Sequence, residues 1–136
     1  MLRGVRGATT VEANDRRQIM DRVAEMLKMM VTANTINTED IGAAIFSATP
    51  DLDAAFPATA ARTVLGWSEV PLFGTQEIEA ANGLPFCIRV LLLWNSAKAQ
   101  PDINHVYLHG ASVLRADAKA GNGTRGSDPE PGDDPR

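Results

Sequence analysis

The chain has 136 residues, which suffices for one domain of ordinary size and leaves no room for a second. Its hydrophobic fraction of 44% and charged fraction of 22% are typical of a globular protein. A formal net charge of -4 gives no overall basic surface for nucleic acid, and a single cysteine excludes an intramolecular disulfide. The longest apolar run, 88–94, is far too short to cross a membrane, and residues 1–10 lack the apolar run of a signal peptide. We therefore expect a cytoplasmic protein.

The N-terminal half of the chain predicts a strand, a long helix and a second strand. Residues 2–11 are rich in β-branched side chains and glycine, a composition that favours a strand. A helix that ends near Asn34 is expected next, because apolar residues recur at helical spacing and would form one buried face. Asn14 or Asp15 can cap its N-terminus. These apolar residues are Ile19, Val23, Met26, Leu27, Met30 and Val31. Residues 41–49 are again apolar and predict the second strand.

The second half predicts a shorter helix and three further strands. Proline at position 57 suits the first turn of a helix over 57–64, and the glycine at position 66 can end it. Strands are expected over 70–76, 86–95 and 105–108. One long helix against about five strands defines an α+β domain, in which we expect a mixed five-stranded sheet packed against that helix.

The composition changes sharply near Asp117. Residues 118–136 hold glycine, proline and acids without one large apolar side chain, so this segment cannot bury enough surface to offset its ordering entropy. We expect a folded domain over 1–117 and a disordered tail over 118–136. A solvated terminus without function is the simplest interpretation of the tail, and a tether for a partner is the alternative.

Arg89 lies inside the apolar run Phe86 to Trp94, which is typical of a central strand covered on both faces. A guanidinium without a partner in such a place would be costly, so it needs an anionic partner or a wet pocket. A structural ion pair with an internal Asp or Glu and an anion-binding site are both open interpretations.

Two further charged residues could belong to the same site. Arg6 lies in a glycine-bearing strand, where alternation gives it mostly small neighbours on its own face and leaves space around the guanidinium. An ordinary surface arginine is the alternative. Glu77 follows the strand over 70–76, and a carboxylate there can accept a hydrogen bond from a hydroxyl or pair with an arginine. A solvated glutamate is the commoner case.

His105, Tyr107 and His109 alternate, so a continuous strand would place all three on one face. No cysteine or carboxylate stands nearby at metal-ligand spacing, so we expect no metal. Tyr107 is a plausible hydrogen-bond donor to a carboxylate, and Cys87 is best interpreted as a small buried apolar residue. The nucleotide-binding glycine patterns and the Gly-x-Ser-x-Gly pattern are absent, so the parts favour an enzyme that holds an anion.

Several blocks of the sequence follow one another from about Leu2 to Asp117: RGVRGATTVE, SATPDLDAAFPATAAR, GW followed by VP, then QE, CIRVL and HVYLHGASVLR. In their order and nearly in their spacing, these blocks resemble the AroH-class chorismate mutases. The resemblance implies a homotrimer with a pseudo-barrel core and active sites between subunits. It also implies a cofactor-free rearrangement of chorismate to prephenate, within phenylalanine and tyrosine biosynthesis. A non-catalytic trimeric anion-binding protein and an imine deaminase on a similar trimeric fold are the alternatives.

The resemblance also assigns roles to individual residues. Arg89 matches the arginine that contacts the ether oxygen and a carboxylate of the substrate, and Arg6 matches a carboxylate-binding arginine. Glu77 matches the acid that holds the ring hydroxyl, and Tyr107 a tyrosine near the side-chain carboxylate. The other residues assigned to the substrate-binding cleft are Phe56, Arg62, Phe73, Gly74, Thr75 and Arg115.

Two positions depart from the family pattern. Thr59 stands where a lysine is common, and Gly74 stands where a cysteine is common. Without the cysteine one side-chain contact to the ring hydroxyl is lost, and a backbone amide at Gly74 or Thr75 can take its place. We therefore expect the departures to bear more on substrate affinity than on the type of reaction.

Overall fold

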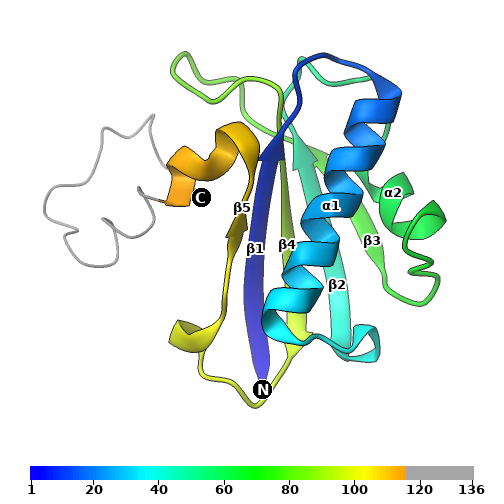
Figure 1. Ribbon diagram of the computed structural model, residues 1–136, viewed down its shortest axis with the longest axis vertical. Coiled ribbons are helices and arrows are strands. Elements are labelled where there is room, and N and C mark those ends of the chain that lie inside the picture. Colours follow the sequence, from blue (N-terminus) through cyan, green and yellow to red (C-terminus); the bar gives the residue numbers. More distant parts are fainter. Residues whose placement is uncertain (116–136) are drawn as a thin grey trace, which may run out of the picture.

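Five strands form one mixed sheet in the computed structural model, which describes residues 1–115 (Figure 1). They are β1 (Leu2–Thr10), β2 (Ile41–Ala48), β3 (Leu72–Gln76), β4 (Cys87–Asn95) and β5 (Val106–Tyr107). Their order across the sheet is β3-β2-β4-β1-β5. The central strand β4 pairs antiparallel with β1 and β2, whereas β3 and β5 run parallel to their neighbours β2 and β1. The expected α+β class with a mixed five-stranded sheet is confirmed.

The long helix α1 (Arg16–Asn34) lies across one face of this sheet (Figure 1). Of the two cap candidates the structure uses Asp15, whose carboxylate accepts from the backbone N–H of Gln18 at 3.0 Å. Asn14 instead accepts from the backbone N–H groups of Asp53 and Ala54, and so holds the loop before the second helix. The helix ends at the residue expected from the spacing of its apolar side chains.

The second helix, α2 (Pro57–Thr63), begins with its proline in the first turn and packs against α1. Its buried alanines, Ala60 and Ala61, join the hydrophobic core that α1 forms with the sheet. Gly66 adopts a positive φ of 70° just beyond the helix, as its expected role as a stop requires. The described residues also contain three single turns of 3₁₀ helix: η1 (Thr38–Asp40), η2 (Gln100–Asp102) and η3 (His109–Ala111). Residues 112–115, directly after η3, are helical as well.

The helices α1 and α2 cover one face of the sheet in the single chain, whereas a smaller apolar cluster of Ala8, Tyr107, Ala111 and Leu114 covers part of the opposite face. Along β4, Val90 and Leu92 point into the core beneath the helices, whereas Leu91 on the opposite face is 37% exposed. We expected this strand to be covered on both faces, and within one chain that expectation is wrong, because both α1 and α2 pack on the same side. The opposite face, which we call the open face, carries further exposed apolar side chains such as Leu2 and Phe73.

The expected tail over 118–136 and its boundary at residue 117 lie outside the described residues. Within residues 1–115, no helix is both long enough and apolar enough to span a bilayer.

Candidate active site

One row of side chains crosses all five strands on the open face. The strand registers place Tyr107, Ala8, Arg89, Ser47 and Thr75 side by side, from β5 to β3. Side chains at paired positions on one face of a sheet are close enough to interact. Ala8, Arg89 and Tyr107 line one hollow on this face.

The neighbouring row on the same face contains the second predicted arginine. Arg6 on β1 pairs with Leu91 on β4, and Leu91 pairs with Ile45 on β2. Ile45 in turn pairs with Phe73 on the edge strand β3. Arg6 is half-buried, so it is not the freely exposed surface arginine that was the alternative interpretation. The two predicted arginines therefore lie on one face, in adjacent rows.

Arg89 and Glu77 form an ion pair at the centre of this face. The Nε of Arg89 lies 3.6 Å from Oε2 of Glu77, and the two side chains are only 16% and 15% exposed. Glu77 is held in place because its backbone N–H donates to the carbonyl of Ala48 at 3.0 Å and Ser47 Oγ donates to the same Oε2. Glu77 is thus not the solvated glutamate that its residue type alone favours.

Two hollows adjoin these residues. The smaller, of about 420 Å³, has Arg89, Glu77, Ser47 and Thr75 in its wall. The larger, of about 920 Å³, is a cleft on the side of β5. Both volumes are in the range of small-molecule sites. Arg6, Leu91 and Tyr107 line both hollows, so the three residues form their common wall.

The charge in these hollows is opposite in sign to that of the whole chain. Among the described residues that line them, the charged side chains are Arg6, Arg89, Arg115 and Glu77. Three cations against one carboxylate in partly desolvated walls give a local positive potential, which attracts anions whatever the net charge of the protein. Burial raises the pKa of the Cys87 thiol even though Arg89 is close, so this cysteine stays protonated and is no nucleophile.

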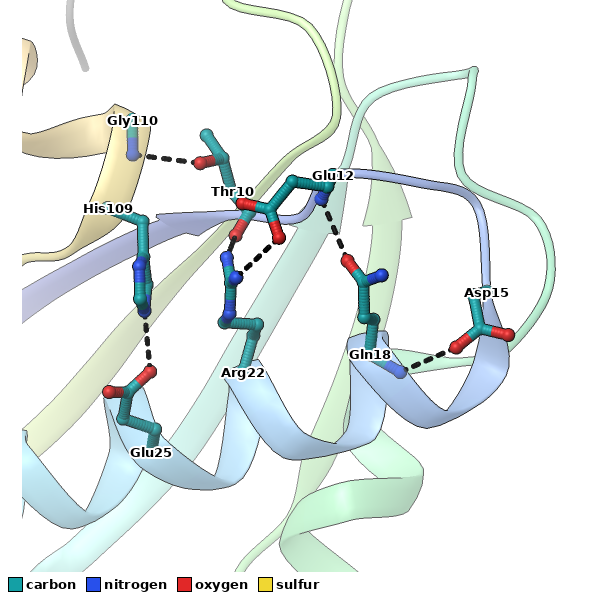
Figure 2. Close-up of polar contacts among 8 residues, drawn as sticks. All are labelled: Thr10, Glu12, Asp15, Gln18, Arg22, Glu25, His109 and Gly110. Atoms are coloured by element: carbon teal, nitrogen blue, oxygen red, sulfur yellow. Dashed lines mark hydrogen bonds and ion pairs between the residues drawn. The ribbon is translucent and has the colours of Figure 1, made fainter.

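The segment after β5 places the last of the predicted cations. The guanidinium carbon of Arg115 lies 6.0 Å from the ring centroid of Tyr107, which is 8% exposed. Figure 2 shows what ties the segment down: the backbone N–H of Gly110 donates to Thr10 Oγ1 at 2.9 Å, and His109 Nε2 lies 2.8 Å from Glu25 Oε1 on α1. The turn that precedes Arg115 is therefore anchored to both β1 and α1.

His109 does not share a face with His105 and Tyr107, contrary to the expectation from their alternation. β5 ends at Tyr107, and His109 begins a 3₁₀ turn with a positive φ of 53°, which directs its ring to Glu25 (Figure 2). His105 instead accepts a hydrogen bond from the backbone N–H of Arg6. The two histidines contact different partners, and among the described residues no group of three metal-ligating side chains occurs.

Four of the predicted cleft residues are not brought to these hollows within one chain. Phe56, just before α2, is 80% exposed, and Arg62 in α2 is also exposed. Phe73 is 64% exposed on the open face of the edge strand β3. Side chains alternate between the two faces along β3, so a Cβ at Gly74 would lie on the face opposite to that of Phe73 and Thr75. No heavy atom lies within 4 Å of that Cβ position. Thr75, by contrast, lines the smaller hollow.

Sequence reasoning missed Ser47 at the site, and it did not predict the hydrogen bond between His105 and the backbone of Arg6. Ser47 lies opposite Arg89 only because β2 pairs with β4 in this register. A serine in an apolar strand gave a weak signal, but nothing local to it indicated which strand would lie beside it.

The fold and the site together define an α+β protein with an arginine-rich hollow on the open face of its sheet. The profile of the chorismate mutase type I family matches residues 2–118, and the chain belongs to this family. The resemblance seen in the sequence blocks is thereby confirmed.

Individual relatives of the chain are also named as chorismate mutases. The chain is 42% identical over 117 residues to "Chorismate mutase AroH" of Bacillus subtilis (strain 168), covering 86% of this chain and 92% of the relative. It is 44% identical over 121 residues to the protein of the same name from Thermus thermophilus, covering 88% and 98%. Among solved structures, a chorismate mutase from Clostridium thermocellum superposes with a TM-score of 0.79 at 44% identity, covering 81% of this chain and 97% of that one.

Proposed function

We propose that the hollow beside Arg89 carries out the reaction of the family, the rearrangement of chorismate to prephenate, by electrostatic preorganisation and without a cofactor. The observation that carries this is the guanidinium of Arg89, which is 16% exposed, paired with Glu77, and part of the wall of a cavity of about 420 Å³. Membership of the chorismate mutase type I family supports the same reaction.

The chemistry of chorismate fits what these residues offer. The molecule carries two carboxylates, an ether linkage and a ring hydroxyl, and it rearranges in one unimolecular step. The ether C–O bond breaks as a C–C bond forms, so the step needs neither a nucleophile nor a proton transfer. A protein contributes by holding the compact reactive conformer and by compensating the negative charge that develops on the ether oxygen.

Arg89 is suited to the second of these tasks. Its guanidinium is always charged and presents a planar fork of donors, whereas a lysine would present one mobile point charge. The carboxylate of Glu77, itself held by Ser47, restrains the guanidinium before substrate arrives. Donors that are already in place stabilise the transition state without reorganisation, and one such donor is typically worth about 3 to 4 kcal/mol.

The remaining residues of the hollows bind and orient the substrate in this proposal. Arg6 and Arg115, which line the larger hollow together with Tyr107, supply charge for the carboxylates. Glu77 keeps lone pairs available for the ring hydroxyl besides its contact with Arg89. Thr75 offers a hydroxyl and a backbone amide in the same wall, where the family commonly has a neighbouring cysteine side chain.

We further propose that the working form is a homotrimer with its active sites between subunits. The open face of the sheet exposes Leu91 and Phe73, and large apolar side chains grouped on one face usually mark an interface. Phe56 and Arg62 line neither of the two hollows within one chain, which a site completed by a second copy would explain.

The trimer is expected to appear as a species of three times the chain mass in sedimentation equilibrium across a dilution series. Burial of the open face would make it persist at the concentrations used for activity assays. A monomer at assay concentration with full activity would contradict the intersubunit site, because the residues of α2 could then play no part in it.

The product of the proposed reaction belongs to the biosynthesis of phenylalanine and tyrosine. We keep the cytoplasm as the proposed compartment, since the chain's one cysteine, Cys87, is a free and buried thiol.

Loss of chorismate absorbance, followed with purified and dialysed protein, tests the function itself. Turnover to prephenate without any added cofactor is the expected result. Binding of chorismate without turnover would instead indicate a non-catalytic anion-binding protein. Inertness toward chorismate together with ammonia release from an imine substrate would indicate an imine deaminase.

Glu77→Gln is expected to lower kcat by about 10-fold, equivalent to about 1.4 kcal/mol. The amide keeps the size of the side chain and can still accept a hydrogen bond from the ring hydroxyl, but it no longer restrains Arg89 by charge. The same absorbance assay gives kcat and KM for the variant. If Glu77→Gln lowers kcat as much as Arg89→Ala does, then Glu77 does more than orient the ring hydroxyl and restrain Arg89, and the proposed roles of the two residues are wrong.

A further inference from the structure

The outer edge of β1 is covered by backbone over only part of its length. β5 is two residues long and pairs with Gly7 and Ala8 alone. Closer to the N-terminus, the backbone groups of β1 that face this edge have no strand beside them. Buried or half-buried backbone donors and acceptors need partners, and here the partners come from side chains.

Two side chains take the place of the missing strand. Gln100 in η2 bonds Gly4 twice: its Oε1 accepts from the Gly4 N–H at 3.0 Å, and its Nε2 donates to the Gly4 carbonyl at 2.7 Å. His105, just before β5, accepts from the backbone N–H of Arg6 at 3.0 Å through its Nδ1. Both side chains also line the larger cleft that Arg6 shares.

We propose that His105 is a positioning residue for Arg6, fixing the backbone from which this guanidinium enters the substrate cleft. The inference rests on the proposed function, in which Arg6 binds a substrate carboxylate. A guanidinium that binds a carboxylate with two parallel hydrogen bonds must meet both oxygens at once. Its affinity for the carboxylate therefore falls when the main chain that carries the arginine can shift. Gln100 secures the same strand two residues earlier.

The contact dictates the ionisation state of the ring. Nδ1 accepts only when it carries no proton, so His105 must be neutral with its proton on Nε2. Burial, and secondarily the positive charge of Arg6, lower the pKa of His105, which favours this neutral form. The other titratable side chains that line the larger cleft beside His105 are Arg6 on β1, Tyr107 on β5 and Arg115 beyond η3. Asp102 in η2 is exposed and does not line this cleft.

Protonation of His105 would break its bond to the Arg6 N–H and place a second positive charge beside the first. Because the pKa is lowered, this happens only below the ordinary histidine value of about 6.5. As pH falls through that lowered pKa, kcat/KM is expected to fall, since the neutral ring is the competent form. Above it, kcat/KM should be insensitive to this residue's ionisation.

The first experiment separates binding from chemistry. His105→Leu keeps a similar volume but removes the acceptor, and it is expected to raise KM for chorismate by about 3- to 10-fold with kcat changed less than about twofold. His105→Asn carries an amide oxygen near the place of Nδ1 and should recover most of that loss. A purely packing role for the ring predicts the reverse order, because leucine fills the space better than asparagine.

The pH profile supplies a readout that a merely structural role would not move. The chain has two histidines, so His109→Asn is a matched control at the exposed ring bonded to Glu25. In wild type and in His109→Asn, kcat/KM should fall at low pH as His105 becomes protonated. In His105→Asn this fall of kcat/KM should be absent. An unchanged fall of kcat/KM in His105→Asn overturns the inference, and this outcome can be read even if His105→Leu does not fold.

Arg6→Ala, measured in parallel, distinguishes failure of this inference from failure of the proposed function. If Arg6→Ala leaves KM unchanged, the proposed carboxylate-binding role of Arg6 is wrong and the inference fails with it. If Arg6→Ala raises KM while folded His105→Leu behaves as wild type, only the positioning role of His105 is overturned.

Discussion

Arg89→Ala is expected to lower kcat by about 100- to 1000-fold in a protein that still folds. The estimate follows from the loss of one preorganised donor at the atom where charge develops, which typically costs about 2.7 to 4 kcal/mol. The guanidinium lies on the open face, so its removal opens no void in the core beneath the helices. Arg89→Lys keeps the charge but not the planar fork, and its kcat should fall between those of alanine and wild type.

Steady-state kinetics by chorismate absorbance, with thermal unfolding of each variant, measures this effect. Arg17→Ala serves as a matched control, because Arg17 is an exposed arginine on α1, outside both hollows. Folded Arg89→Ala with turnover near wild type would remove the basis of the proposed mechanism.

Phe46→Ala is expected to lower the free energy of unfolding by about 3 to 5 kcal/mol. Phe46 is fully buried on the helix side of β2, within the core that α1 and α2 form with the sheet. Deleting its ring removes a large apolar area from this core and leaves a cavity that the surrounding strands can close only in part. Since a domain has about 5 to 15 kcal/mol in total, the loss is large.

Chemical denaturation at one fixed protein concentration gives the difference, because the stability of an oligomer depends on concentration. Phe46→Leu, which retains most of the apolar volume, should lose considerably less. A loss below about 1 kcal/mol for alanine would show that this position is not the packed centre of the core.

The elements of the chain could be predicted because their signals are local. The periodic apolar residues of α1, its cap at Asp15 and the proline that opens α2 act over a few residues, so the observed bounds lie close to the expected ones. β5 is shorter than expected because the side chain of His105, instead of its backbone, bonds to β1. This replacement of a backbone hydrogen bond by a side-chain one depends on β1, almost a hundred residues away in the sequence, and leaves no signal near His105.

Two candidate site residues drew attention through local sequence signals: Arg89 because its charge interrupts an apolar strand, and Arg6 because small residues surround it. Ser47, by contrast, acquires its role from strand pairing and from the burial of Glu77. The open face of β4 could not be foreseen either, since an apolar run does not tell whether a helix or another subunit covers it.

Stabilisation of the transition state by Arg89 is measured most directly with a stable bicyclic diacid that carries an ether oxygen and imitates the compact reacting conformer. Its dissociation constant should be determined for wild type, Arg89→Lys and Arg89→Ala beside kcat/KM for chorismate. The predicted result is that the logarithm of the dissociation constant rises in proportion to the loss of kcat/KM, with a slope near one. An affinity for the diacid that stays constant while kcat/KM falls would contradict a guanidinium that acts on the developing charge.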